Sequence, residues 1–435
     1  MYPWHVVVLV LALVLYAGRG VSADDPRSEP LAECLVRGGI PNVLEKLERG
    51  RAIRILYLGG SITNAPGWRT MTEQWFREQY PQARIEATNA AISGTGSDVA
   101  AFRLQHDVLR HEPDLLFVEF AVNDSWTSAG RIQRAMEGVV RQTWCAQPNC
   151  DIVFVYTVHE GMLTDLHAGE LPPAVKSHEV VANHYGIPSI LFGGEVARLE
   201  KEGKLIFTGD WPQTEEEKAA LGDTILFSGD GAHPYDAGHA LYAAAVIRSI
   251  GKMKGVGEPG PHALPAPLRE DNFEYAKPTP IDRAQLSPGW RKLDVTGDPA
   301  VRKLLEGAEF GDKLDTLWLA EQPGESISFR FRGTGVVVYD MVGPDCGQII
   351  VTLDGGEPRT IPRFDSWCEW HRVYCFTAAA DLPDEVHTIR LEIDHEQPDK
   401  VKLLAERGVT MDDPARYDAT RWYVSYLFIT GRITE

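Results

Sequence analysis

The sequence predicts a parallel α/β domain followed by an all-β domain, because the two halves of the chain carry different hydropathy patterns. From Ile53 to Ile247, apolar runs of strand length alternate with helix-like stretches, which is typical of βαβ units. A stretch rich in proline and glycine follows, and beyond it apolar residues recur with period two. At 435 residues, the chain is long enough for two or three domains. We therefore expect an α/β domain over residues 24–254, a linker over 255–284 and a β-sandwich or jelly-roll domain over 285–435.

The first half of the chain carries the apolar runs that we interpret as strands. They are Ile53–Leu58, Arg84–Ala91, Asp114–Val122, Asp151–Thr157 and Ile187–Phe192. The helical stretches are Trp68–Gln79, Asp98–Arg110, Arg131–Cys145, Pro173–Tyr185 and Asp236–Ile250. Because the strands are apolar on both faces and alternate with helices, they predict a three-layer domain with a parallel sheet at its centre. Residues 203–227 break this rhythm, since they are charged and resemble a loop.

The second half of the chain has the sequence pattern of an antiparallel β domain. Glycine, aspartate and proline separate the apolar segments, which are SISFRFRG, GVVVYDMVG, QIIVTLDGG, HTIRLEID and WYVSYLFITG. This punctuation is typical of a sandwich or jelly roll. Residues 363–376 gather the aromatic side chains of Trp367, Trp370, Tyr374 and Phe376. Aromatic residues in sandwich strands usually belong to the core, and exposed rings that bind the faces of sugars are the alternative.

The amino terminus carries a short apolar segment, Val6 to Ala17. It is too short to span a bilayer comfortably, and the small residues at positions 21–23 follow it, which is the pattern of a cleaved signal peptide. We predict a signal peptide over residues 1–23 and a secreted protein, extracellular or periplasmic, with no stable membrane insertion after cleavage. The first five residues lack lysine and arginine, so an uncleaved anchor is the alternative.

The chain is strongly acidic, with a formal net charge of −19 at pH 7. A chain of this charge repels nucleic acid and anionic membrane surfaces overall. We therefore expect no nucleic-acid partner.

Cysteine usage agrees with export, because an even number of cysteines in a secreted chain indicates disulfide bonds. The six are Cys34, Cys145, Cys150, Cys346, Cys368 and Cys375. Cys145 and Cys150 bracket a short polar turn, which makes a bond between them plausible, and the remaining connectivity stays open. The chain has no C-x-x-C motif, so a zinc ribbon is not expected.

Two blocks of small residues follow predicted strands. In LYLGGSITNAPG, two glycines precede Ser61 at the carboxyl end of a strand, where open α/β sheets bind ligands. The alternative is that Ser61 caps the helix that begins near Trp68. In NAAISGTGSD, Gly94 and Gly96 leave backbone N–H groups unshielded, which suits an oxyanion site. The alternative is a tight turn with a capping Ser97 or Asp98.

Two further blocks supply polar side chains. FVEFAVND ends an apolar strand at Asn123, whose amide could donate a hydrogen bond, although an Asx-turn would use the same residue. In SGDGAHPYDAGH, Asp230 precedes His233 by three residues and could hold its Nδ1–H while Nε2 faces outward. Asp236 is expected to cap the next helix, and His239 to be a surface or packing residue within that helix.

In this order, each at the end of a strand, the four blocks resemble those of the SGNH hydrolase superfamily, also called GDSL-like esterases. The resemblance covers about Ile53–Ile247 and implies a flavodoxin-like SGNH fold. It implies that Ser61 is the nucleophile, His233 the base and Asp230 the acid. It further implies an oxyanion hole formed by Ser61, Gly94 and Asn123.

The chain departs from the usual family pattern at two places. Gly60 stands where most relatives have aspartate, so a supporting contact of the oxyanion loop is missing or replaced. The AVND block lacks the glycine that usually precedes the asparagine and aspartate. Both departures fit a subgroup that acts on carbohydrate esters.

The resemblance implies a serine esterase that removes O-acetyl groups from a polysaccharide or glycoconjugate through an acyl-enzyme. A lipid esterase or thioesterase with the same triad, and a catalytically weak carbohydrate-binding protein, are the alternatives. We expect no cofactor and no metal. HEVVANH, His178 to His184, superficially resembles a zinc motif, but the zinc spacing needs histidine at position 182, where the chain has alanine.

Overall fold

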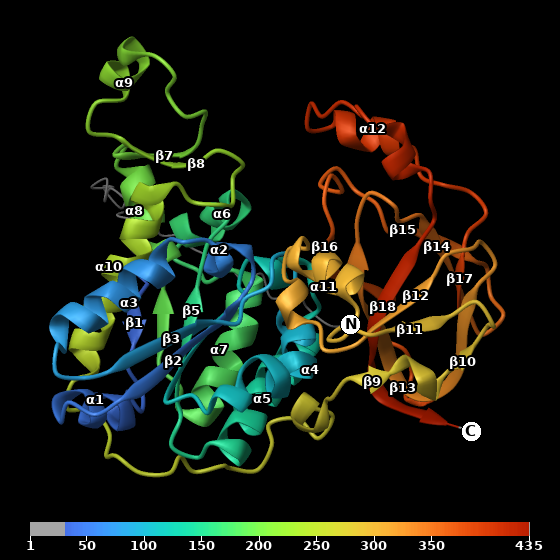
Figure 1. The fold of residues 1–435 in the computed structure, drawn as a ribbon. Helices are drawn as coiled ribbons and strands as arrows, with labels where there is room; N and C mark the ends of the chain where they lie inside the picture. Colours follow the sequence, from blue (N-terminus) through green and yellow to red (C-terminus); the bar gives the residue numbers. More distant parts are fainter. Residues whose placement is uncertain (1–30, 435) are drawn as a thin grey trace, which may run out of the picture.

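The structure of the protein, a computed structural model, describes residues 31–434. It has two parts that lie side by side, an α/β domain formed by the first half of the chain and a β-rich domain formed by the second half (Figure 1). The predicted signal peptide lies outside the described residues.

The α/β domain is built on a six-stranded sheet with the order β1-β6-β5-β4-β2-β3. Its strands are β1 (Cys34–Leu35), β2 (Ile53–Gly59), β3 (Ile85–Asn89), β4 (Leu115–Glu119), β5 (Asp151–Tyr156) and β6 (Ser189–Leu191). The short β1 pairs antiparallel with β6, and the other neighbours run parallel. The five parallel strands are ordered as in a flavodoxin-like sheet. In such a sheet, ligands bind beyond the carboxyl ends of the strands, at the point where the strand order reverses. Here that place lies between β2 and β4.

Helices cover both faces of this sheet, as the apolar strands predicted. Those of the α/β domain are α1 (Pro41–Glu48), α2 (Ser61–Asn64), α3 (Trp68–Gln79), α4 (Ser97–Asp107), α5 (Ala129–Ala146), α6 (Leu163–His167), α7 (Pro173–Tyr185), α8 (Gly193–Lys201), α9 (Glu215–Leu221) and α10 (Asp236–Met253). Helix α10 packs on α3 and α8, whereas α5 packs between α4 and α7 on the other face (Figure 1). The bounds of α3 and α7 are those predicted from the sequence.

Residues 203–227, expected to be a loop, contain secondary structure. Strands β7 (Leu205–Thr208) and β8 (Ile225–Ser228) form a two-stranded parallel sheet, and α9 lies between them in the chain. A capping box of Thr214 and Glu217 stabilises the start of α9, although none of its residues is buried. The segment projects from the domain at the top of Figure 1. Its high charge reflects this exposure and does not mark an absence of structure.

The predicted linker, residues 255–284, packs along the α/β domain. The ring of His262 stacks on Trp144 at 4.7 Å between centroids, and its Nε2 lies 2.9 Å from Asp151 Oδ1. The N–H groups of residues 268 and 269 donate to the buried carboxylate of Glu137. The segment, which contains η4 (Phe273–Tyr275), β9 (Thr279–Pro280) and η5 (Ile281–Arg283), is therefore a strap fixed to the domain surface, seen along the bottom of Figure 1.

The second part of the chain confirms the prediction of an all-β domain. Its ten-stranded antiparallel sheet has the order β11-β12-β18-β13-β17-β14-β15, with β10 and β16 pairing with β13, and β9 with β18. The strands are β10 (Gln285–Leu286), β11 (Arg291–Leu293), β12 (Leu317–Ala320), β13 (Ser326–Val342), β14 (Gln348–Leu353), β15 (Arg359–Pro362), β16 (Arg372–Ala379), β17 (Glu385–Ile393) and β18 (Trp422–Thr434). Its helices are α11 (Pro299–Glu306), η6 (Gly311–Lys313), α12 (Lys400–Ala405) and η7 (Pro414–Tyr417).

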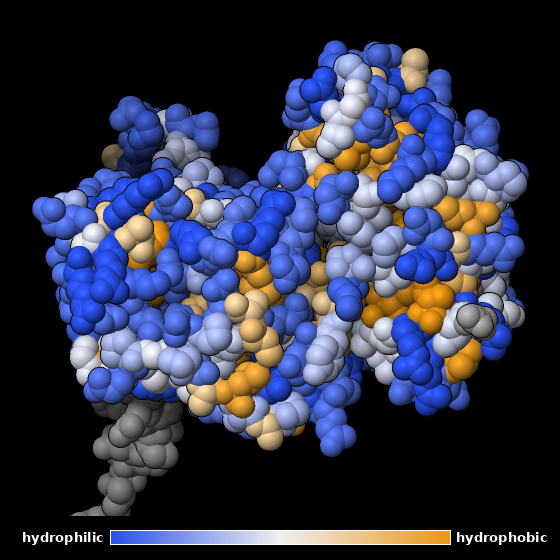
Figure 2. Space-filling view, turned by 60° about the horizontal axis from the view of Figure 1, so that its bottom comes forward, coloured by the Kyte–Doolittle hydropathy of each residue, from blue (hydrophilic) through white to orange (hydrophobic). Residues whose placement is uncertain are grey.

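An apolar interface joins the two domains. The ring of Phe102 on α4 stacks on Phe428 of β18 at 5.0 Å, and Phe428 stacks on Tyr339 of β13 at the same distance. All three side chains are buried. Figure 2, which views the molecule from below, shows the two lobes in contact, with a mainly hydrophilic surface and small hydrophobic patches. The buried aromatic stack fixes the orientation of the β domain relative to the α/β domain.

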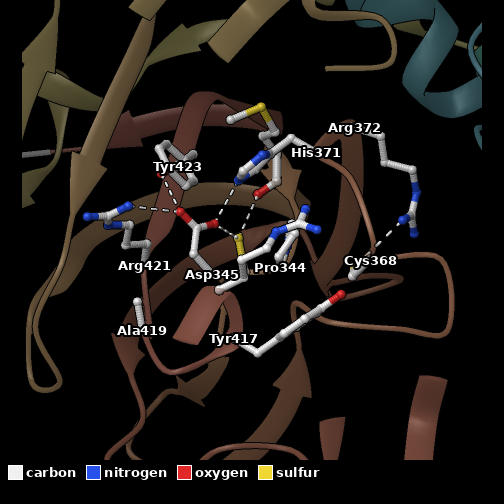
Figure 3. Close-up of polar contacts among 12 residues, drawn as sticks. Pro344, Asp345, Cys368, His371, Arg372, Tyr417, Ala419, Arg421 and Tyr423 are labelled. Carbon is white, nitrogen blue, oxygen red and sulfur yellow. Dashed lines mark hydrogen bonds and ion pairs between the residues drawn. The ribbon is translucent and has the colours of Figure 1, made fainter. Parts of the chain in front are cut away.

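A partly buried carboxylate, that of Asp345, organises the loops of the β domain at the start of β16 (Figure 3). Asp345 contacts His371 Nε2 at 2.7 Å, and it accepts hydrogen bonds from Arg421 at 3.0 Å and from the Tyr423 hydroxyl at 2.8 Å. Burial alone would raise the pKa of Asp345, but His371 and the other donors outweigh it and lower the pKa to about 2. The ionised carboxylate therefore links His371, just before β16, to Arg421 and Tyr423 at the start of β18.

The disulfide between Cys145 and Cys150 that the sequence predicted is not present, and all six cysteines are free in the structure. Cys145 is exposed in the last turn of α5, with its thiol 3.6 Å from Glu274 of the strap. The Cys150 side chain is buried and its thiol contacts the carbonyl of Asp151. The two side chains therefore lie in different environments, one exposed and the other buried.

Candidate active site

The backbone places Ser61 at the carboxyl edge of the sheet. Strand β2 ends at Gly59, and α2 begins at Ser61 with Gly60 as its N-cap residue. A Cβ atom at Gly60 would lie only 2.1 Å from Asn123 Oδ1, so a larger residue at this position would displace the Asn123 side chain. The aspartate that most relatives carry here would require Asn123 to take another position. The close approach of the two loops explains why the chain has glycine at position 60.

Ser61, His233 and Asp230 form a continuous chain of hydrogen-bonding contacts. Ser61 Oγ lies 2.7 Å from His233 Nε2, and His233 Nδ1 lies 2.6 Å from Asp230 Oδ2. A carboxylate can only accept, so it fixes the proton on Nδ1 and leaves Nε2 to accept from the serine. The sequence predicted these three residues as nucleophile, base and acid, and the structure brings all three together.

Asp230 is held as an anion by its own loop. Its Oδ1 accepts the N–H groups of His233 at 2.8 Å and Ala232 at 3.0 Å, and the hydroxyl of Ser228 at 3.0 Å. Partial burial would raise the pKa of Asp230, but the N–H and ring of His233 and the N–H of Ala232 outweigh it and lower the pKa to about 2. Asp230 is therefore ionised at any pH near neutrality.

Asp236 and His239, the other aspartate and the other histidine of this block, do not take part in the triad. Asp236 is the exposed first residue of α10, the N-cap residue is Tyr235, and no side chain caps the helix, so the expected cap by Asp236 is wrong. His239 is buried, and its Nδ1 accepts the N–H of Trp68 at 3.3 Å. Burial lowers the pKa of His239 to about 4, so it stays neutral and packs at the start of α3.

The three predicted oxyanion donors lie on loops that meet at one rim. The N–H of Ser61 belongs to the first turn of α2, where N–H groups have no partner within the helix. Gly94 follows β3 with a φ of +74°, a left-handed conformation that favours glycine. Asn123 begins η2 (Asn123–Trp126), and its side chain lies against Gly60.

Asp124 ties two of these loops together. Its Oδ1 accepts the N–H of Ser97 at 3.0 Å, at the start of α4, and its Oδ2 lies 2.8 Å from His178 Nε2 on α7. Asp124 and His178 are each about 1% exposed. His178, which the sequence offered only as part of a false zinc motif, therefore holds the aspartate that joins the Gly94 and Asn123 loops.

Glu119 is a functional candidate that sequence reasoning missed. It is the last residue of β4, it is completely buried, and its carboxyl accepts hydrogen bonds from Thr63 at 2.9 Å and Thr157 at 2.5 Å. It also accepts the N–H of Gly60, and burial raises its pKa above the usual range for glutamate. The only signal in the sequence was a glutamate inside an otherwise apolar strand.

The β domain reaches this rim through Tyr374 on β16. A Cβ at Gly94 would lie 2.8 Å from Tyr374 Cε2, so the ring packs directly on the glycine. The guanidinium groups of Arg363 and Arg372 lie over the same ring, at 5.7 and 5.2 Å from its centroid. Of the other aromatic residues in this stretch, Phe376 is buried, as predicted for the core, whereas Trp367 is half exposed.

Within residues 31–434, no cluster of three or more histidine, cysteine, aspartate and glutamate side chains could hold a metal ion. Over the same range, no helix has the length and apolar character needed to cross a membrane.

Comparison with known proteins agrees with this site. Residues 57–241 match the GDSL-like Lipase/Acylhydrolase family. These residues form a domain of this family. The matched residues include Ser61, Gly94, Asn123, Asp230 and His233. The protein is thus a carboxylic ester hydrolase of the GDSL-like family, and its β domain lies outside the matched residues.

Solved structures show the same two-domain architecture. The esterase is similar to a two-domain esterase (CEX) active on acetylated mannans, co-crystallised with mannopentaose, with a TM-score of 0.64 and 21% identity over 92% of this chain and 97% of that one. A second structure of such a two-domain esterase gives a TM-score of 0.62 and 20% identity over 90% and 95%. A mutant of Axe2, an acetyl-xylooligosaccharide esterase from Geobacillus, covers 46% of this chain, with 19% identity and a TM-score of 0.37. No curated protein matches the chain by sequence. At these identities the likeness is one of fold.

Proposed function

We propose that this GDSL-like esterase removes O-acetyl groups from a carbohydrate, with Ser61 as nucleophile, His233 as general base and Asp230 as the acid that orients the base. The observation that carries this proposal is the pair of short contacts from Ser61 Oγ to His233 Nε2 and from His233 Nδ1 to Asp230 Oδ2. A serine in this arrangement is activated at the moment of attack, since the imidazole accepts its proton.

The reaction runs in two halves. Ser61 Oγ attacks the acetyl carbonyl while its proton passes to His233 Nε2, and Asp230 stabilises the imidazolium that forms. The tetrahedral oxyanion is bound by the N–H groups of Ser61 and Gly94 and the amide of Asn123. His233 then gives its proton to the departing sugar hydroxyl, and the carbonyl is restored as acetyl-Ser61. Water, activated by the same histidine, hydrolyses this ester and regenerates the enzyme.

Two observations support a carbohydrate ester as the substrate. The fold likeness extends over both domains to an esterase whose described activity is on acetylated mannans. The side chains of His233 and Asp230 are more than half exposed, so the triad lies open to solvent, as a site for a bulky polymer requires. We also propose that the protein is secreted and acts on this polymer outside the cytoplasm.

The experiment that tests the proposal compares acyl groups and acceptors. Purified enzyme is assayed on 4-nitrophenyl esters from acetyl to octanoyl, and for acetate release from acetylated mannan and acetylated xylan. We expect kcat/KM to be highest for the acetyl ester and acetate to appear from at least one glycan. Higher kcat/KM on the octanoyl ester, with no acetate from either glycan, would favour a lipid esterase and overturn the proposal. N-terminal sequencing of the exported protein tests the secretion step, and a mature chain that begins at Asp24 is the expected result.

A further inference from the structure

Exposed tryptophans lie beside the catalytic loops of this protein. Among the described residues, only Trp126, Trp211 and Trp367 are exposed, at 83%, 51% and 50%. Trp126 closes η2, three residues after Asn123. Trp211 packs edge-on against Tyr235, with ring centroids 5.0 Å apart. Tyr235 follows His233 by two residues. Trp367 belongs to the β domain. An indole left in water beside an active site is a candidate for binding an apolar surface of a ligand.

Trp126 lies between the two loops that carry the reacting groups. One face of its indole stacks on the ring of His159, with centroids 5.4 Å apart and planes inclined by 12°. The next residue, Glu160, donates its N–H to the carbonyl of Gly231 at 2.8 Å, inside the loop that carries Asp230 and His233. The indole is therefore fixed at the rim of the site, next to the Asn123 loop on one side and the catalytic acid and base on the other.

The support beneath the indole is rigid. His159 Nδ1 accepts the N–H of Gly161 at 3.1 Å, which leaves the proton on Nε2 to be donated to Ser125 Oγ at 3.1 Å. Ser125 in turn donates to the carbonyl of Ala121 at 3.1 Å. Burial lowers the pKa of His159, so the ring stays neutral at neutral pH. The neutral His159 ring, hydrogen-bonded at both nitrogens, holds the indole of Trp126 in place. The other face of the indole stays exposed to solvent.

We propose that the open face of Trp126 is a stacking subsite for a neutral pyranose ring next to the acetylated sugar. The C–H face of a pyranose is an apolar surface that stacks on an indole, whereas its hydroxyl groups stay in water. The sugar class follows from the charges around this rim. Asp165 lines the same small cavity of about 180 Å³ as Trp126, and the exposed Glu160 follows His159, on which the indole stacks. These two carboxylates repel a uronic or sialic acid, so the subsite favours an uncharged glycan.

This inference rests on the proposed function only for the identity of the neighbouring sugar, because sugar binding is measured without turnover. The protein for the binding measurements carries Ser61→Ala, so that no ester is cleaved. The probes are mannopentaose and xylopentaose as neutral chains and a galacturonic acid oligomer of the same length as the acidic one. The variants are Trp126→Ala, Trp126→Phe and, as a control, Tyr275→Ala. Tyr275 is 82% exposed, which matches Trp126, but it ends η4 of the strap, which packs on α5 and α4.

Isothermal titration calorimetry should detect binding of at least one neutral chain, and Trp126→Ala should raise its Kd by about tenfold. Trp126→Phe, which keeps a flat ring, should restore most of the affinity, and Tyr275→Ala should leave the Kd unchanged. The inference is wrong if neither neutral chain binds, if the acidic chain binds as tightly, or if Trp126→Ala weakens binding no more than Tyr275→Ala does.

The stacking subsite and the proposed function can each fail without the other. If the wild-type enzyme releases no acetate but the Ser61→Ala protein binds a neutral chain through Trp126, the proposed function fails and the subsite stands. If acetate is released but the Kd is indifferent to Trp126, the function stands and the subsite is wrong.

Discussion

Glu119 accepts a hydrogen bond from Thr63 at 2.9 Å, and through it the last residue of β4 holds the first turn of the helix that carries Ser61. The same carboxyl accepts the N–H of Gly60. In this chain, which has glycine where most relatives have aspartate, a glutamate from the neighbouring strand binds the residues on either side of Ser61. Glu119 does not touch the substrate site and is a positioning residue.

We expect Glu119→Gln to lower kcat by about tenfold or more while KM changes little, because a misplaced nucleophile affects turnover more than binding. Glutamine keeps the shape of the side chain but turns one acceptor into a donor, next to the Thr157 hydroxyl or the Gly60 N–H. The readout is kcat per folded molecule, with circular dichroism as the measure of folding. A variant with wild-type kcat would show that Glu119 only stabilises the core.

The ionisation of Glu119 gives a second signature. Because its pKa is raised in the folded protein, the stability linked to its proton is present at low pH and is lost as the pH rises. The difference in thermal midpoint between wild type and Glu119→Gln should therefore change between about pH 4 and pH 8, in favour of the glutamine variant at the higher pH. A difference that is constant over this range would contradict the burial argument.

The two aspartates of the catalytic block should behave in opposite ways. Asp230→Asn removes the charge that orients His233, and we expect kcat to fall by about 10³ to 10⁴, as in other Ser-His-Asp sites. Since the pKa of Asp230 is lowered to about 2, its stabilising charge is present above the unfolded pKa of about 4 and is lost only as the pH falls toward 2. Asp230 therefore stays ionised above about pH 5, and its own titration adds no pH dependence to the loss in kcat over that range.

Asp236→Ala is the matched control. Asp236 is exposed in the first turn of α10 and makes no capping bond, so only its interaction with the helix dipole is lost, about 0.3–1 kcal/mol. Turnover should stay within about twofold of wild type. If Asp236→Ala abolished turnover and Asp230→Asn did not, the roles in this loop would be reversed.

Gly60→Ala tests the close approach of the nucleophile and asparagine loops. The added methyl group would meet Asn123 Oδ1 at 2.1 Å, so the amide must move away from the oxyanion position. Loss of one oxyanion donor costs about 10² to 10³ in kcat. Gly130→Ala in α5, where a Cβ meets no atom within 4 Å, is the control and should leave kcat unchanged. Equal activity of the two variants would show that Asn123 does not bind the oxyanion.

Tyr374 tests whether the β domain supports the site. Its ring packs on Gly94, so Tyr374→Ala should loosen that loop and lower kcat by several-fold, about 1 kcal/mol in the transition state. Tyr374→Phe keeps the ring and should behave as wild type. If both variants retain full kcat on a small acetyl ester, the contact is only part of the domain interface.

The sequence predicted those features that depend on local patterns. The bounds of α7 are set by Pro173 at its first turn and by Gly186 in a left-handed conformation at its end, both readable from the sequence. The site was also predictable, because strand ends of a parallel sheet converge, and Asp230 and His233 lie on one short loop. Each of these signals lies within a few residues of the position that it determines.

Features that depend on distant contacts were not predictable in this way. Glu119 and His178 act through residues from other elements, and a glutamate in a strand or a histidine in a helix carries no local sign of its partner. Tyr374 packs on a glycine 280 positions earlier in the chain. The composition of residues 255–284 indicated a linker, but His262 and Glu137 fix this segment to the domain. The spacing of Cys145 and Cys150 gave no information about which way their side chains point.

The measurement that tests the central claim most directly is kcat for acetate release by wild type and by Ser61→Ala, with the thermal midpoint of each protein measured alongside. The account predicts that Ser61→Ala lowers kcat by at least about 10⁴-fold, because no other group in the site can form the acyl-enzyme. The thermal midpoint should stay the same within about two degrees, since Ser61 is only partly buried and its hydroxyl contacts the exposed His233. A folded Ser61→Ala protein that releases acetate at a rate near that of wild type would contradict the assignment of Ser61, and with it the whole account of the site.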